Sequence, residues 1–189
     1  GEPFLYFPLL LEGIKRARSK GFKVGVVTNA YGANTPEDAE LWLKPLVESG
    51  TSYLSISNDT FHYGQEHENP AAIAHTVAKN LGMETSSISI DPPKVVDHTD
   101  AEKKGGPVVG GGAKFRGRAV EKLTDSLPLR PWETLCECPD EDLQSPSRVH
   151  VDCFGNVQVC QGISIGNMWS TPLSDLVGKY DGQTHPICG

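Results

Sequence analysis

A regular alternation of strand-like and helix-like segments between residues 8 and 125 constrains the fold of this chain most strongly. The run "FKVGVVTN" (22–29) is too apolar for a strand with one solvated face, so it predicts a strand buried on both faces, as in a parallel sheet. Further strands are predicted at 53–57, at 86–90 and, interrupted by glycines, within 106–117. They recur about every 30 residues with helices between them, which is typical of βαβ units. The sequence therefore predicts an α/β fold with a parallel sheet or barrel.

Local signals predict where the helices between these strands begin. Proline favours the first turn of a helix, and Asn or Thr favours the capping position before it. Helices are therefore expected to start at Pro8, at Thr35-Pro36 and at Asn69-Pro70, with a further helix at 118–125. Pro45 is expected to kink or shorten the second of these helices.

The alternation ends in a segment rich in Pro, Ser and acidic residues at 126–147, which predicts a domain boundary. We place the two parts at 1–130 and 131–189. Residues 148–160 then alternate with period two around Phe154-Gly155-Asn156, a pattern that predicts a β-hairpin. The second part is thus expected to be a small module that contains β-structure.

The cysteines are confined to this second part. None occurs in the first 135 residues, and the chain then contains Cys136, Cys138, Cys153, Cys160 and Cys188. Such clustering points to metal or redox chemistry, with structural thiols as the alternative. Cys160 ends the returning strand of the hairpin, and the "CEC" segment precedes it closely enough to share a metal. Zinc and an iron–sulfur cluster both suit thiolate ligands, and the spacing does not choose between them.

Charge and hydropathy exclude some classes of function. A net charge of −7 disfavours a broad nucleic-acid surface, and no partner of that kind is expected. No apolar run approaches the ~20 residues of a membrane span, and nothing resembles a signal peptide. We therefore expect no membrane association and a cytoplasmic location.

Other candidate motifs carry less information. The glycines of 106–117 match neither a phosphate loop nor a dinucleotide fingerprint. His62 stands near the end of a predicted strand, where ligands bind in α/β folds, although a structural histidine is an equal alternative. A second group of acidic and imidazole side chains flanks "PPKVV" and is expected to be a solvated loop: Asp91, Asp97, His98 and Asp100.

Five segments in order resemble a radical SAM enzyme with a SPASM or twitch type of C-terminal extension. "GEP" (1–3) is similar to the Gly-Gly-Glu-Pro motif of that family, with its first glycine missing. The others are "VVTNAYG" (26–32), "YLSISNDTFH" (53–62), "FRGRA" (115–119) and "GNVQVCQGISIGNM" (155–168). The resemblance implies a partial (β/α)6 TIM-like barrel that lacks its first strand and cluster loop, followed by an incomplete auxiliary iron–sulfur domain.

The resemblance also implies a binding site for S-adenosylmethionine. Gly1 and Glu2, with Pro3 completing the motif, would contact the methionyl amino group. Asn29 and Ser57 would be polar groups at strand ends near the cofactor. Arg116 or Arg118 would face the methionyl carboxylate, with a surface role as the alternative.

For the auxiliary [4Fe–4S] cluster, the resemblance favours Cys138 and Cys160 as ligands. Cys136 lies close enough to replace Cys138, and Cys188 is a further candidate. Cys153 lies where the family pattern requires no ligand, so it is expected not to bind the cluster.

The activity implied for the intact enzyme is reductive cleavage of S-adenosylmethionine at a [4Fe–4S] cluster, which gives a 5′-deoxyadenosyl radical. Expected partners are a peptide, protein or small-molecule substrate and an electron donor such as flavodoxin or ferredoxin. The family's Cys-x3-Cys-x2-Cys loop is absent from this sequence, so we expect a fragment, cut at both ends, that is inactive by itself. Two alternatives remain. One is an α/β-barrel lyase or binding protein with a structural zinc–thiolate tail, and the other is a non-enzymatic thiol–metal module.

Overall fold

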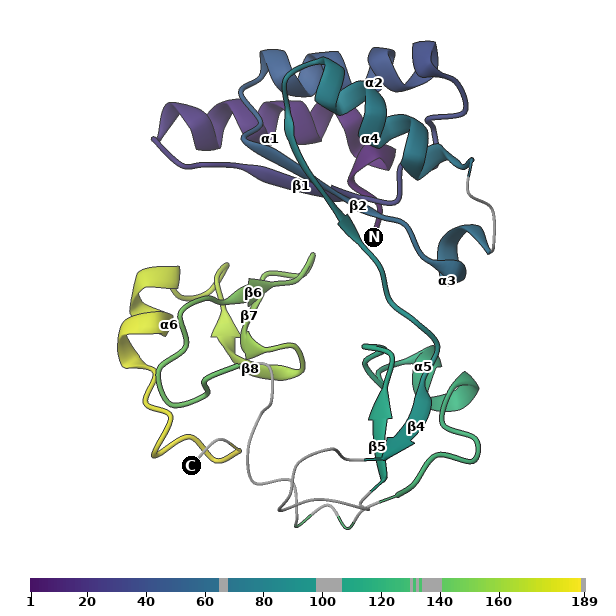
Figure 1. The fold of residues 1–189 in the computed structure, drawn as a ribbon. Coiled ribbons are helices and arrows are strands. Elements are labelled where there is room, and N and C mark those ends of the chain that lie inside the picture. Colours follow the sequence, from purple (N-terminus) through teal and green to yellow (C-terminus); the bar gives the residue numbers. More distant parts are fainter. Residues whose placement is uncertain (65–67, 98–106, 130, 132, 134–140, 188–189) are drawn as a thin grey trace. The chain divides into compact units, whose positions relative to one another are not determined.

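The computed structural model of the chain describes residues 1–64, 68–97, 107–129, 131, 133 and 141–187 (Figure 1). The chain divides into two compact units, residues 1–128 and 129–189. This division lies close to the boundary predicted at residue 130. Over the described residues the fold is mixed α/β, with three separate small sheets.

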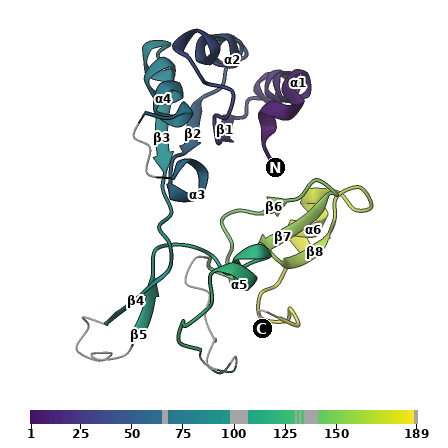
Figure 2. The same ribbon diagram turned by 90° about the vertical axis from the view of Figure 1, so that its right-hand side faces the viewer.

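Unit 1 is built on a parallel sheet of three strands in the order β1-β2-β3. The strands are β1 (Gly25–Thr28), β2 (Tyr53–Ser57) and β3 (Glu84–Ile88). Helices α1 (Phe7–Ser19), α2 (Pro36–Glu48) and α4 (Pro70–Asn80) alternate with them in the sequence and lie over one face of the sheet (Figure 2). The predicted βαβ pattern is therefore confirmed over this part of unit 1.

Two of the predicted helix starts, those of α2 and α4, are confirmed by their caps, while α1 begins at Phe7, one residue before the predicted Pro8, with no side-chain cap. The Thr35 hydroxyl accepts a hydrogen bond from the Asp38 amide at 3.1 Å, and the Asn69 side chain accepts one from the Ala72 amide at 3.0 Å. Of the two effects predicted for Pro45, shortening of the helix is wrong, because α2 continues to Glu48, and a kink stays a prediction. Pro45 lies in the last turn, where losing one backbone hydrogen bond is outweighed by the burial of neighbouring leucines, Leu43 and Leu46.

The two faces of the parallel sheet differ in chemistry. Leu54 and Ile56 of β2 are fully buried on the helix-covered face, where they form the core with Val26 of β1. The alternate residues of β1 and β2 point away from the helices, and Val27 is 52% exposed there. The prediction that the segment 22–29 is buried on both faces is therefore wrong, since helices cover only one face.

The predicted parallel alternation also ends earlier than expected. β4 (Lys94–Asp97) and β5 (Pro107–Gly110) form a separate antiparallel pair, so the strand expected within 106–117 exists but runs antiparallel to its neighbour. Only residues 98–106 connect the two strands, fewer than the roughly twelve that a parallel crossover needs. α5 (Arg118–Lys122) follows and is shorter than predicted. The barrel that the family resemblance implies stays a prediction.

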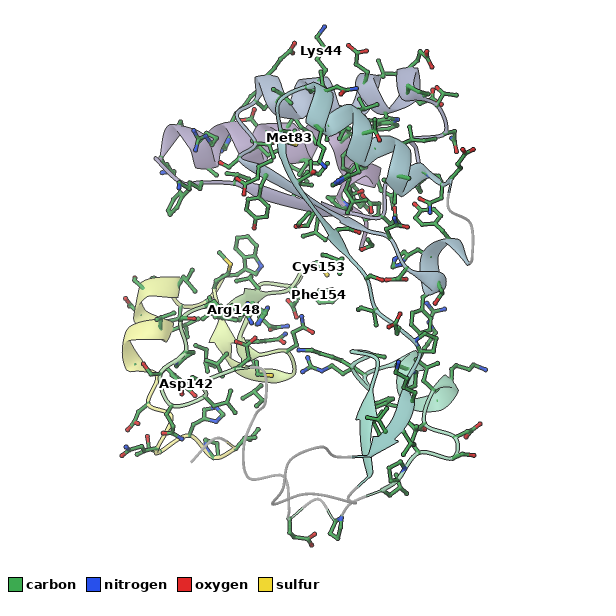
Figure 3. The ribbon with its side chains drawn as sticks, viewed as in Figure 1. Lys44, Met83, Asp142, Arg148, Cys153 and Phe154 are labelled. Carbon is green, nitrogen blue, oxygen red and sulfur yellow. The ribbon has the colours of Figure 1, made fainter. Side chains whose placement is uncertain are left out.

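Unit 2 is an antiparallel sheet of β6 (His150–Val151), β7 (Asn156–Cys160) and β8 (Ile163–Asn167), followed by α6 (Leu173–Lys179). The hairpin predicted at 148–160 is confirmed. Its turn contains Cys153 and Phe154 (Figure 3) and is closed by Asp152, which accepts hydrogen bonds from the backbone amides of Phe154 and Asn156, both at 2.9 Å. The side chain and amide of Asn156 hold the pKa of Asp152 below its ordinary value.

Two adjacent glycines follow β5, and comparing substitutions at them tests how closely the backbone is packed there. Gly111 and Gly112 both have positive φ, +108° and +81°. A Cβ at Gly111 would lie 2.4 Å from the backbone oxygen of Pro92, whereas a Cβ at Gly112 would meet nothing within 4 Å. We expect Gly111→Ala to destabilise the β4–β5 pair by about 1–3 kcal/mol more than Gly112→Ala, because backbone atoms must shift to admit the methyl group. Amide hydrogen exchange of the β4 and β5 residues measures the difference, and equal protection in the two variants would contradict it.

Candidate functional site

The parallel register brings the ends of β1 and β2 together at one edge of the sheet, which we call the carboxyl edge. Thr28 of β1 pairs with Ile56 of β2, so Asn29 and Ser57 follow at the same level. Ligands of open α/β sheets bind outside the carboxyl ends of the strands. We therefore expect a ligand-binding site of unit 1 at the carboxyl edge.

The Glu2 carboxylate is fixed at this edge by three hydrogen bonds. Its Oε1 accepts from the Phe4 amide at 3.1 Å and from the Thr28 hydroxyl at 2.8 Å, and its Oε2 accepts from the Asn29 amide at 2.9 Å. Glu2 is half-buried and caps the short 3₁₀ helix η1 (Pro3–Tyr6). A carboxylate has about four acceptor positions, so these three bonds leave one on Oε2.

Three of the residues predicted for S-adenosylmethionine are thus at one edge. Glu2 and Asn29 are in direct contact, and Ser57 ends the neighbouring strand. The structure shows Glu2 as a helix cap rather than as the end of a strand, with Gly1 before it and Pro3 as the first residue of η1. That these residues surround one cavity stays a prediction.

A second group of polar residues lies at the same edge, directly after β2. Asp59 caps the short helix α3 (Thr60–Tyr63) and accepts hydrogen bonds from the amides of Phe61 and His62. The same oxygen lies 2.8 Å from Nδ1 of the His62 ring. Glu2 and the residues that hydrogen-bond to it, Thr28 and Asn29, are called the Glu2 cluster. The Tyr63 hydroxyl donates to the backbone oxygen of Asn29 and so joins the Asp59 group to this cluster.

Burial and the charge of Glu2 both change the pKa of the Tyr63 hydroxyl. Burial raises the pKa of the Tyr63 hydroxyl above its ordinary value, and the negative charge of Glu2 raises it further. Both effects disfavour the tyrosinate form. The hydroxyl thus remains a hydrogen-bond donor to Asn29 at neutral pH.

A small cavity lies beneath the loop that follows β1. Its volume is about 20 Å³, and its lining is almost entirely apolar, with Phe4, Thr28, Ala33, Trp42, Leu43 and Ala74 among the lining residues. A space of this size holds roughly one water molecule. It is therefore a packing defect of the core and too small for a cofactor.

The remaining predicted site residues divide between the described residues and those outside them. Arg116 and Arg118 precede and open α5, and both are exposed, so their proposed contact with a carboxylate stays a prediction. Asp91 forms an isolated bridge with Gly112. The side chain of Asp97 and the residues His98 and Asp100 lie outside the described part of the chain.

The predicted metal ligands are only partly described. Cys160 is buried at the end of β7, and Cys153 is exposed in the turn before it. Cys136, Cys138 and Cys188 lie outside the described residues. Among the residues that the structure describes, no three His, Cys, Asp or Glu side chains gather closely enough to hold a metal ion.

Comparisons with protein families, with curated proteins and with solved structures find no match to this chain. Within the described ranges, no helix has both the length and the apolar character needed to cross a membrane.

Sequence reasoning singled out His62 but missed Asp59 and Tyr63 on either side of it. The available signal was the Asp59-Thr60 pair directly after a predicted strand, since Asp is a preferred helix cap. A helix of four residues leaves no periodic pattern, which is why α3 was not predicted.

The raised pKa of Tyr63 predicts a loss of stability at alkaline pH. The folded state holds the phenolic proton more tightly than the unfolded state, whose pKa is near 10.0. This contribution is therefore fully present below that pH and is lost as the pH rises through the folded-state pKa. The difference in tyrosinate absorbance between the wild type and Tyr63→Phe isolates the titration.

In the same titration, Glu2→Gln should lower the pKa of Tyr63, because the variant lacks the negative charge. Glu12→Gln on α1 is the control, since Glu12 pairs with Arg16 instead. Titration of Tyr63 at or below its ordinary pKa in the wild type would contradict the prediction.

Proposed function

We propose that the carboxyl edge binds the methionyl amino group of S-adenosylmethionine and that the chain is part of a radical SAM enzyme. One observation carries the proposal: the Glu2 carboxylate is held by Thr28 and Asn29 with one acceptor position left on Oε2. An ammonium group is the complement of that position, because it donates a charge-assisted hydrogen bond to a carboxylate.

The fixed geometry of Glu2 supports binding. Its three hydrogen bonds come from a helix start, a strand side chain and a loop amide, so the side chain is ordered before a ligand arrives. A group held in place in advance loses less conformational entropy when it binds. The neighbouring hydroxyl and amide groups, Ser57 and Asn29, suit the polar parts of a nucleoside-containing cofactor.

The uncovered face of the parallel sheet also suits a polar ligand. The Ser55 and Ser86 hydroxyl groups lie 2.8 Å apart on neighbouring strands, at positions that alternate with the core residues of β2. Strands of a fully buried parallel sheet are near-continuous apolar runs. We take these hydroxyl groups, exposed at Ser86 and buried beside it at Ser55, to favour a polar ligand over an apolar layer at this face.

When bound, the [4Fe–4S] cluster of such an enzyme supplies the electron that cleaves S-adenosylmethionine to a 5′-deoxyadenosyl radical. Residues of this chain bind and orient the cofactor. We propose a peptide, protein or small molecule as the substrate, a flavodoxin or ferredoxin as the electron donor, and a cytoplasmic location.

Unit 2 is proposed to hold an auxiliary iron–sulfur cluster. Cys160 is the one proposed ligand that the structure describes, and the β6–β7 hairpin fixes its position at the end of a strand. Cys136, Cys138 and Cys188 complete the proposed ligand set. Thiolate ligands suit zinc equally well, so the zinc–thiolate tail remains the competing proposal.

Binding of S-adenosylmethionine tests the assignment of Glu2. We expect Glu2→Gln to weaken binding by a factor on the order of 10–100, as for the loss of one hydrogen bond to a charged group. Glu12→Gln, an exposed change on α1, should leave the affinity unchanged. Isothermal titration calorimetry of the purified chain measures both, and equal affinities of the wild type and Glu2→Gln would refute the role of Glu2.

Anaerobic reconstitution tests the proposed cluster in unit 2. With iron and sulfide, we expect a labile and substoichiometric cluster that is lost in Cys160→Ala and retained in Cys153→Ala. Bound iron and visible absorbance are the measurements. Stoichiometric zinc with no iron would favour the zinc–thiolate alternative, and equal loss in both variants would show that the ligands are wrongly assigned.

A further inference from the structure

We infer that His62 is a proton-transfer residue of the carboxyl edge and that Asp59 is the residue that positions it. The inference rests on the geometry of this pair. It applies to any ligand at the edge that carries an exchangeable O–H or N–H group.

The Asp59–His62 contact determines which ring nitrogen carries the proton. The Asp59 side chain is only 3% exposed, and its Oδ1 lies 2.8 Å from His62 Nδ1. An ionised carboxylate only accepts hydrogen bonds, so Nδ1 is the donor and Nε2 of the neutral ring keeps its lone pair. Carboxylates that orient imidazoles in this way also raise the basicity of the far nitrogen.

The His62 ring is accessible. The His62 side chain is 38% exposed, whereas Asp59 is buried behind it. A purely structural role would not need the imidazole, because Asp59 already caps α3 through the amides of Phe61 and His62. The cap fixes the carboxylate, and the carboxylate in turn fixes the ring.

The Asp59–His62 pair lies at the carboxyl edge of the sheet. Asp59 comes two residues after the end of β2, and Asn58 donates a hydrogen bond to the Ile88 carbonyl at the end of β3. Tyr63, adjacent to His62, contacts Asn29 of the Glu2 cluster. The imidazole therefore belongs to the same edge as the carboxylate that we assign to an ammonium group.

In the proposed step, a ligand O–H or N–H bond breaks and its proton passes to Nε2, while the electron pair stays on the ligand atom. The imidazolium that forms is stabilised by the negative charge of Asp59. The proton then returns to the product or passes to water, so the residue is regenerated. Proton transfers of this kind are the usual role of a positioned histidine.

Diethyl pyrocarbonate probes the lone pair directly. Nε2 attacks a carbonyl carbon of the reagent, forms an N–C bond and expels ethyl carbonate, which breaks down to carbon dioxide and ethanol. His75 is the internal control, because its Nδ1 contacts the neutral Thr85 hydroxyl at 3.1 Å and not a carboxylate.

We expect Asp59→Asn to slow the modification of His62 by a factor on the order of 10 and to leave the rate at His75 unchanged. Asn caps helices as well as Asp does, so the urea midpoint should also be unchanged. Peptide mass spectrometry gives the rate at each histidine. The same His62 rate in a folded Asp59→Asn variant would overturn the inference.

A second measurement needs no variant. Nitrogen-15 NMR of the histidine-labelled wild-type chain should show the His62 proton on Nδ1 and a bare Nε2. A proton on Nε2 in the neutral ring would overturn the inference, whatever the stability of Asp59→Asn.

Adding S-adenosylmethionine separates this inference from the proposed function. In a chain that binds the cofactor, we expect protection of His62 but not of His75, and unchanged modification of His62 would remove it from the site. Failure of the cofactor to bind would refute the proposed function, while the Asp59-dependent reactivity of His62 would still support the pair.

Discussion

The hydrogen bonds of the Glu2 carboxylate connect the first residues of the chain to the end of β1. Thr28 and Asn29 are 26 and 27 positions away in the sequence, and the same carboxylate also caps η1. The aromatic ring of Phe4, two residues later, packs edge-on against Trp42 of α2. One side chain thus determines how η1 begins, how the residues around it lie against the end of β1 and where a free acceptor oxygen lies at the carboxyl edge.

The edge depends on local structure as much as on the sheet. Parallel pairing brings the strand ends together, but helix caps hold the carboxylates of Glu2 and Asp59 in place. Each cap leaves its carboxylate with a further partner beyond the helix amides, Thr28 and Asn29 for Glu2 and the His62 ring for Asp59. Of the two, Glu2 retains an acceptor position on Oε2, while Asp59 is buried and acts on a ligand only through the His62 ring.

The sequence predicted the parts of this fold that depend on local signals. β2 and the starts of α2 and α4 were correct because a short strand-forming segment, a capping residue and a following proline each act within a few positions. The direction of β5 was not predictable from its own residues, because it depends on the length of the connection to β4. The exposed face of β1 was not predicted, because an apolar sequence shows that a side chain is hydrophobic but not whether another element covers it.

The residues of the candidate site also differ in whether the sequence alone could indicate them. Asn29, Ser57 and Glu2 were all singled out through the family resemblance and not from the sheet pattern alone, and the register then places Asn29 and Ser57 at the same level. The pairing of Asp59 with His62 required a helix of one turn, too short to leave a periodic pattern. The role of Thr28 was not predicted, because threonine is common in strands for its β-propensity alone. The fold is needed to show that its hydroxyl donates a hydrogen bond to Glu2.

The turn closed by Asp152 has a consequence for the order of folding. Its contacts join residues no more than six positions apart, including the Asn156 and Gln158 side chains at 2.8 Å and 3.4 Å. Contacts this local cost little loop-closure entropy and form early, in the microsecond range of hairpins. The position of Cys160 at the far end of β7 is therefore determined by a nucleus that needs neither unit 1 nor a metal ion to form.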